Sequence, residues 1–283
     1  MDEALGEDAV TLWICGTCSV EYPDTAEPPA ACPICTDERQ YVPATGQTWT
    51  TSQERAGAGH RTQTAPLEPD LYAVTVDPQV GIGQTAYLVR TPAGNLLWDP
   101  TGYVDQAAVD AIAPLGGIAA IAASHPHMFG VQVEWSRAFG GVPVYVCEAD
   151  KEWLGRSDEV VRFWSDSCEP VPGLTFVQAG GHFRGSAVAH WPAGAEGRGV
   201  LLSGDTIAPV TDRRWVTFMR SFPNSIPLSA RAVEQVVSRL EPYAYERLYG
   251  NFGGIVASDA KEAVRRSADR YIGWVRGDFD ADT

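Results

Sequence analysis

Residues 124–130 read Ser-His-Pro-His-Met-Phe-Gly and follow an apolar run at residues 118–123 that is typical of a buried strand. Side chains of extended chain alternate between two sides. We therefore expect His125 and His127 to point into one pocket, with Pro126 stiffening the backbone between them. Two imidazoles at the end of one strand predict a metal site, and a chance pair of histidines in a loop is the alternative.

Two later segments favour the metal site over the chance pair. Residues 179–186 read Ala-Gly-Gly-His-Phe-Arg-Gly-Ser, and residues 201–206 read Leu-Leu-Ser-Gly-Asp-Thr. Each lies at the edge of a strand-like apolar run. They add His182 and Asp205, so the chain offers three histidines and one carboxylate at comparable strand ends.

Taken in order, these three motifs resemble the metallo-β-lactamase fold superfamily over roughly residues 70–283. A hairpin at residues 85–98 that ends in Asp99-Pro-Thr-Gly fits the same order. The resemblance implies an α/β protein with an αββα sandwich. It also implies that His125, His127 and His182 hold one metal, while Asp205 occupies the position that normally bridges two.

The chain departs from the superfamily at the second metal. The superfamily pattern is His-x-His-x-Asp-His, whereas this chain has Phe129 at the place of the Asp and Gly130 at the place of the last His. A further histidine is expected near residues 249–254, where the chain has Asn251. We therefore expect a mononuclear site that holds one zinc or iron ion.

Four of the six cysteines form two pairs, Cys15-Gly-Thr-Cys18 and Cys32-Pro-Ile-Cys35, with thirteen residues between them. Such pairs place four thiolates around one metal, and they resemble a zinc ribbon or a rubredoxin. Zinc is favoured, since Ser19 stands where rubredoxins usually have glycine. In a module this small the metal supplies much of the folding free energy. Two disulfides are the alternative, which a cytoplasmic protein disfavours.

These observations divide the chain into three parts: a zinc-ribbon or rubredoxin-like module at residues 1–45, a linker or wrapping arm at residues 46–68, and a metallo-β-lactamase-like domain at residues 69–283. The middle part is polar, without sustained periodicity. Helical spacing predicts helices at residues 104–115 and 229–240, and a last helix to residue 275 that begins with a capping box of Asp259 and Glu262.

Composition limits the partners. The formal net charge of −15 and the pI near 4.7 disfavour nucleic acid and anionic membranes, so we expect a small-molecule substrate. No apolar run approaches the roughly 18 residues of a membrane helix. Residues 1–9 lack the features of a secretory signal. The sequence therefore predicts a cytoplasmic protein.

The donor set predicts the chemistry. A divalent metal on three neutral histidines keeps an open position, which suits hydrolysis of an ester, thioester, lactone or amide. Asp205 is the candidate catalytic residue, as ligand, base or both, and Arg184 is a candidate for substrate binding. A mononuclear iron oxidoreductase that resembles the sulfur dioxygenases is a second reading. A non-catalytic metal-binding or assembly protein is the third.

Overall fold

Two β-sheets pack face to face in the centre of the molecule. The computed structural model describes residues 11–283, so the expectation for residues 1–9 lies outside the described residues. The first sheet has the order β10-β9-β8-β7-β6-β5-β4. Its strands are β4 (Arg61–Glu68), β5 (Leu71–Asp77), β6 (Ala86–Val89), β7 (Leu96–Trp98), β8 (Ala120–Ala122), β9 (Val144–Cys147) and β10 (Val161–Trp164).

The second sheet has the order β11-β12-β13-β14-β19-β20. It pairs antiparallel except between β14 and β19, which are parallel. Its strands are β11 (Ser167–Val171), β12 (Leu174–Gln178), β13 (Ala187–Trp191), β14 (Val200–Leu202), β19 (Arg247–Tyr249) and β20 (Ile255–Val256).

Successive side chains of a strand point to opposite faces of its sheet, and this alternation assigns them to different hydrophobic cores. Leu96 and Trp98 of β7 face the second sheet, while Leu97 between them faces outward. Leu201 of β14 likewise faces away from its neighbours Val200 and Leu202. This period of two produces one core between the sheets and one on each outer face.

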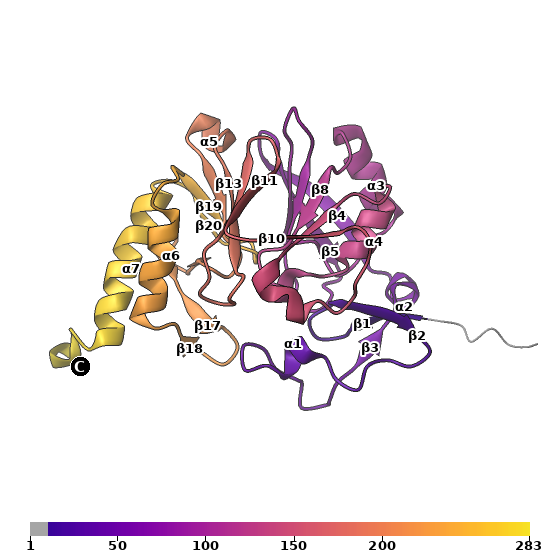
Figure 1. Cartoon of the computed structure of the whole chain (residues 1–283), viewed down its shortest axis with the longest axis horizontal. Coiled ribbons are helices and arrows are strands. Elements are labelled where there is room, and N and C mark those ends of the chain that lie inside the picture. The colour runs from indigo at the N-terminus through magenta and orange to yellow at the C-terminus, as the bar shows by residue number, and fades with distance from the viewer. Residues whose placement is uncertain (1–10) are drawn as a thin grey trace, which may run out of the picture.

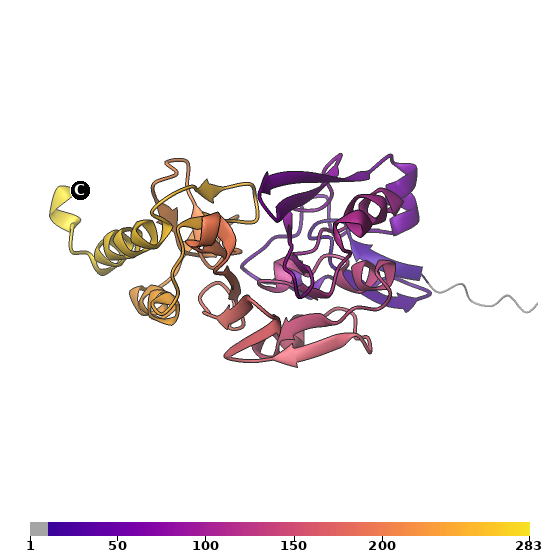
Figure 2. The same ribbon diagram turned by 90° about the horizontal axis from the view of Figure 1, so that it is seen from above.

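Helices cover both outer faces, which completes the predicted αββα sandwich (Figure 1). In Figure 2 the first half of the chain, indigo to magenta, lies beside the second half, orange to yellow. The helices over the first sheet are α3 (Gln106–Ile112) and α4 (Gln132–Ala138), and those over the second are α6 (Ala230–Leu240) and α7 (Ala260–Arg276). Within residues 11–283, none of the helices combines the length and the apolar character that crossing a membrane requires.

The start of α7 corrects one prediction. Asp259 stands at the N-cap in a left-handed conformation, with φ 53°, and its side chain makes no cap hydrogen bond. The capping box of Asp259 and Glu262 is therefore wrong, although the helix begins at the next residue. Sequence spacing fixed the position of the helix but not the backbone of the residue before it.

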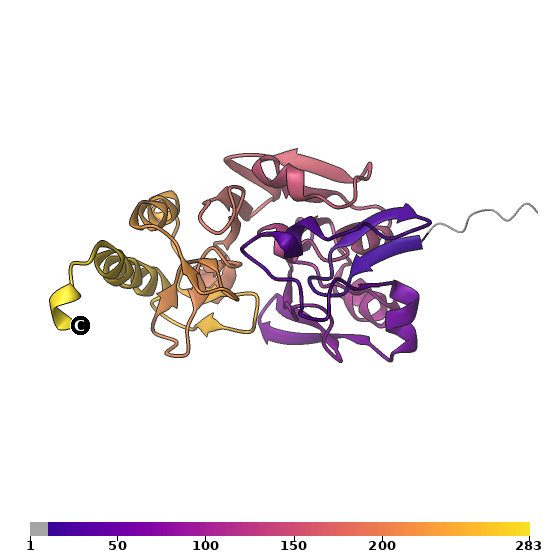
Figure 3. The same ribbon diagram turned by 90° about the horizontal axis from the view of Figure 1, so that it is seen from below.

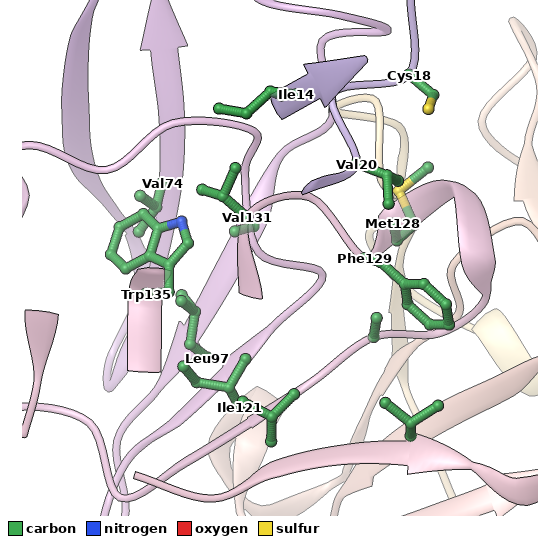
Figure 4. Close-up of a cluster of buried hydrophobic side chains, with 14 of the residues drawn as sticks. Ile14, Cys18, Val20, Val74, Leu97, Ile121, Met128, Phe129, Val131 and Trp135 are labelled. Carbon is green, nitrogen blue, oxygen red and sulfur yellow. The ribbon is translucent and has the colours of Figure 1, made fainter. Parts of the chain in front are cut away.

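The N-terminal module forms a sheet of order β2-β1-β3 with a short helix. Its elements are β1 (Thr11–Cys15), β2 (Glu21–Thr25), α1 (Pro33–Thr36) and β3 (Trp49–Thr50). It does not stand apart from the rest: Ile14, Val20 and Ile34 belong to the same buried cluster as Phe129 and Trp135. Figure 4 shows part of this cluster.

Residues 46–68, expected as a linker or wrapping arm, contain regular secondary structure. They contain β3, the helix α2 (Ser52–Gly57) with a complete capping box, and the edge strand β4. The strand β4 pairs with β5 along its length. The polar composition that suggested a linker is explained by the position of β4 at a sheet edge, where one side faces solvent. The division of the chain into domains stays a prediction.

Candidate metal centres

Three loops bring the predicted ligands together, one after a strand of the first sheet and two after strands of the second. His125 and His127 follow β8, His182 lies between β12 and β13, and Asp205 follows β14. One ligand atom from each of these four buried residues lies within 4.8 Å of the others. The structure therefore assembles the whole predicted donor set.

The backbone at the two histidines differs from the expected extended chain. His125 is extended, but Pro126–Met128 forms a 3-10 turn, η2. The turn still lets both rings face one point, with ring centroids 5.1 Å apart at an interplanar angle of 77°. Proline at the first position of the turn has its fixed φ without losing a needed donor, which explains its place between the histidines.

Hydrogen bonds to the far nitrogens orient the rings. His125 Nδ1 lies 2.9 Å from the Ser124 hydroxyl, and His182 Nδ1 lies 3.0 Å from the carbonyl oxygen of Met219. In both rings Nε2 is then left to face the centre. Partners of this kind fix the tautomer of a metal-binding imidazole.

The distances among the donor atoms fit a metal ion. His182 Nε2 lies 3.2 Å from His127 Nδ1, and Asp205 Oδ2 lies 3.5 Å from His125 Nε2 and 3.9 Å from His182 Nε2. Two ligands at about 2.05 Å from a tetrahedral ion lie about 3.3 Å apart. His125 Nε2 is also buried without a hydrogen-bond partner, which a metal at this centre would supply.

The electrostatics favour neutral imidazoles, as metal binding requires. Burial lowers the pKa of His182 to about 3, and burial also lowers the pKa of His127 well below its usual range, with neighbouring histidines adding to both effects. Burial alone would raise the pKa of Asp205, but the nearby imidazoles of His125 and His182 outweigh it and lower the pKa. Two of the three imidazoles are therefore held neutral beside one carboxylate, which suits metal binding.

Two supporting residues hold the loops in register. Asp99 Oδ1 accepts the backbone N–H of Ser124 at 2.6 Å, and burial raises the pKa of Asp99 to about 7. Gly204 has φ 53°, and a Cβ there would overlap with the Ser124 side chain, so glycine is needed where the β14 loop meets the β8 loop. The turn motif at residues 99–102 points to Asp99 in the sequence, but it does not predict that Asp99 holds the histidine loop.

The second metal site is filled by packing. Phe129 is 2% exposed and belongs to the cluster shared with the N-terminal module. Gly130 has φ 51°, and any Cβ there would clash with the carbonyl oxygens of Pro100 and Thr101. Asn251 is buried, and both atoms of its amide lack a hydrogen-bond partner. None of the three can serve as a histidine or carboxylate ligand.

The four cysteines form the other centre. Cys15 Sγ lies 3.7 Å from Cys35 Sγ, and Cys18 Sγ lies 3.6 Å from Cys32 Sγ. Four thiolates at about 2.3 Å from one ion would lie about 3.8 Å apart, whereas bonded sulfurs lie about 2.05 Å apart. All four are buried and free, so the structure agrees with a metal-binding cluster and not with disulfides.

The N-terminal module is tied directly to the loop that carries the histidines. Glu21 Oε1 accepts the N–H of Val133 at the start of α4, and its Oε2 lies 2.8 Å from Arg156. The backbone N–H of Glu21 also donates to the Gly130 carbonyl at 3.1 Å. An acceptor at the first turn of α4 satisfies a helix donor that has no partner within the helix.

A cavity of about 430 Å³ opens above the His/Asp centre, between the N-terminal module and the two-sheet sandwich, which we call the large domain. The large domain contributes His127, His182 and Asp205 to it, and the module contributes Arg39, Gln40 and Tyr41. Arg184 does not reach it and lines a separate surface hollow with Glu148 and Lys151. The sequence offered no signal for Arg39 or Gln40, because their place follows from how the two parts pack.

Comparisons with known proteins agree with this fold. No family model matches the chain. The mono-zinc form of the metallo-β-lactamase FIM-1 from Pseudomonas aeruginosa is 16% identical, with a TM-score of 0.51 over 74% of this chain and 95% of that one. The metallo-β-lactamase DIM-1 is 12% identical, with a TM-score of 0.55 over 75% of this chain and 97% of that one.

The chemotaxis sensor ODP, solved as a peroxy diiron species, is 19% identical, with a TM-score of 0.51 over 75% of this chain and 94% of that one. These low identities show a common fold, the metallo-β-lactamase fold. At the level of sequence the chain is 46% identical over 262 residues to the uncharacterized protein YmaE of Bacillus subtilis (strain 168), which covers 92% of this chain and 95% of that protein. The chain therefore belongs to the family of YmaE and has the metallo-β-lactamase fold.

Proposed function

We propose that the chain is a metal-dependent hydrolase of a small ester, thioester, lactone or amide, and that it uses a mononuclear site. One observation carries the proposal: three imidazoles and a carboxylate converge, and two of these imidazoles and the carboxylate line a cavity of about 430 Å³ that suits a small substrate. The positions of a second metal hold Phe129, Gly130 and Asn251.

His125, His127 and His182 would hold the ion, with Asp205 as a fourth ligand. When bound, a divalent ion lowers the pKa of water toward about 7 and polarises a carbonyl oxygen. Asp205 is the only carboxylate in the donor set, so we assign it the proton transfer at Oδ1, because Oδ2 is the oxygen that faces the histidine nitrogens. Ser124 and the Met219 carbonyl keep two of the rings in orientation while the proton moves.

We propose zinc for the cysteine cluster and zinc or iron for the His/Asp centre. A specific observation favours the second candidate function, a mononuclear iron oxidoreductase. Nitrogen donors with one carboxylate suit ferrous iron, and the structural neighbour ODP is a diiron protein. The free state of all six cysteines supports a reducing compartment, which we propose to be the cytoplasm.

Metal analysis of protein purified without added metal distinguishes these candidates. We expect two zinc ions per chain for the hydrolase and one zinc with one iron for the oxidoreductase. One zinc that is lost from a Cys32→Ser variant, with none at the histidines, would favour the non-catalytic protein and would contradict the proposal.

The substitution Asp205→Asn tests the catalytic role. The amide keeps an oxygen near the ion but takes no proton, so we expect a modest loss of bound metal and a fall in turnover of about 10²–10⁴-fold. Asp212→Asn is the matched control, since Asp212 pairs with Arg214 on the surface. Rates come from a panel of esters, thioesters and lactones, with metal content measured beside each. Full activity of Asp205→Asn would remove the proposed base.

A further inference from the structure

We infer that Arg39 of the N-terminal module forms the recognition site for a substrate carboxylate, so that the substrate of the His/Asp centre is a small acyl compound with a free carboxylate. The inference rests on the proposed function and names its substrate class. It depends on three features of the cavity: its charge, its unpaired donor and its apolar rim.

The charge is the first feature. Among the described residues that line the cavity, Arg39 is the only arginine or lysine. Its guanidinium lies 4.0 Å from the ring centroid of Phe183, and that ring in turn lies 5.0 Å from His127 and 5.2 Å from His182. One phenyl ring thus separates a cation from the metal ligands in a protein whose net charge is −15.

The unpaired donor is the second feature. Arg39 lines the cavity and is 11% exposed at its side chain. Its Nη1 pairs with Asp37 Oδ1 at 3.2 Å, and its Nε is buried without a hydrogen-bond partner. Buried N–H groups are usually satisfied, so an unpaired guanidinium donor at a cavity wall indicates a site for a hydrogen-bond acceptor.

The site is held in place by the large domain. Ser221 Oγ donates to the carbonyl of Arg39 at 3.1 Å, and the Asn224 amide donates to the carbonyls of Glu38 and Gln40 at 2.9 and 3.0 Å. Figure 3 shows the indigo N-terminal segment reaching toward the orange segment that carries β17 (Met219–Ser221) and β18 (Ile226–Pro227). The same β17 supplies the Met219 carbonyl to His182, so one strand positions both the cation and a metal ligand.

The chemistry of the ligand follows from these groups. A guanidinium presents a planar fork that matches a carboxylate, and the single cation of the cavity can hold one such group. Tyr41 and Phe252 line the cavity and are 49% and 53% exposed, so its rim is apolar. A carboxylate on a short hydrocarbon chain satisfies both requirements.

The test compares two substrates that differ in one charge: mono-para-nitrophenyl glutarate and its methyl ester. We expect Arg39→Gln to lower kcat/KM for the carboxylate ester by about 10- to 100-fold, the size of a charge-assisted hydrogen bond, and to leave the methyl ester unchanged. Arg39→Lys keeps the charge without the fork and should fall between. Arg162→Gln, an exposed arginine on β10, is the matched control.

Calorimetric binding of glutarate to the purified holoprotein gives a readout that does not depend on turnover. We expect wild type to bind glutarate and Arg39→Gln to bind it about 10- to 100-fold more weakly, with dimethyl glutarate bound by neither. If wild type hydrolyses neither ester but binds glutarate through Arg39, the hydrolase proposal fails and the recognition site stands.

If wild type hydrolyses both esters equally and Arg39→Gln has the same effect on each, the hydrolase stands and the recognition site is overturned. Tighter binding of inorganic phosphate than of glutarate would also overturn the carboxylate assignment. Thermal melting of both Arg39 variants checks that they are folded. If Arg39→Gln is unfolded, Arg39→Lys serves as the test, and equal effects of Arg39→Lys on the two esters would count against the site.

Discussion

Removing the metal of the cysteine cluster should destabilise the large domain and not the N-terminal module alone. The double substitution Cys32→Ser and Cys35→Ser deletes two of four ligands, and structural zinc contributes about 10–16 kcal/mol to the folding of small zinc modules. Few domains are more stable than about 15 kcal/mol in total. The module should therefore unfold without its metal.

The effect on the large domain follows from the shared core. Ile14, Val20 and Ile34 are each at most 1% exposed, and full burial of three such side chains is worth about 5–9 kcal/mol. Since part of that burial lies within the module, we expect about 3 kcal/mol to be lost from the large domain. For a chain of this size that is a fall in Tm of roughly 6–12 °C.

The assay is calorimetric melting, with metal content measured on the same samples. Cys147→Ser with Cys168→Ser is the matched control, because it makes the same chemical change outside the cluster. The control should keep both metals. If the Cys32/Cys35 variant instead loses one metal and the large domain melts at the wild-type temperature, the module is independent and the reasoning from the shared core is refuted.

Three further outcomes can be measured on the same protein. Gly130→Ala should lower the free energy of unfolding by about 2 kcal/mol or more, because Gly130 has a left-handed backbone and a Cβ there would clash with two carbonyl groups. The loss should exceed that of Gly140→Ala, where φ is 84° and no atom lies near. Equal losses in urea melts would contradict the clash. Burial raises the pKa of Glu21 to about 7, so the native state binds the Glu21 proton more tightly than the unfolded state does. The free energy of unfolding should therefore fall by about 3 kcal/mol from pH 4.5 to pH 7. If a Glu21→Gln variant shows the same dependence of stability on pH, Glu21 is not the cause. Phe129→Asp should not add a second metal and should lower the Tm, because the carboxylate would be buried in an apolar cluster; a second equivalent in metal analysis would show that packing does not block that site.

The parts of the site that the sequence predicted are those set by local order. His125, His127, His182 and Asp205 each follow a recognisable apolar strand, and these strand ends, one in the first sheet and two in the second, bring the four ligands together. The cysteine cluster could likewise be predicted from the spacing of the two cysteine pairs alone. The helix α6 also begins within one residue of its predicted start, where Ser229 caps it by accepting the N–H of Ala232.

The parts that it missed depend on contacts between distant segments. Arg39 belongs to the cavity only because Ser221 and Asn224 hold its segment over His182, and these residues lie more than 180 positions away in the chain. Arg184 adjoins His182 in sequence yet lines a different hollow, because the loop turns at Gly185 against Asp150. Local sequence motifs therefore predicted the metal ligands, but they did not predict which other residues line the cavity.

The two candidate metal centres differ in the softness of their donor atoms, so competing metal ions should bind to them with different preference. Four thiolates attract cadmium and copper(I), whereas imidazoles and a carboxylate prefer harder ions. A soft metal would therefore bind first at Cys15, Cys18, Cys32 and Cys35. Because the module forms one wall of the cavity, any change in the geometry of that cluster shifts Arg39 and Gln40 relative to the histidines. A toxic ion would then alter the His/Asp centre without ever binding to it.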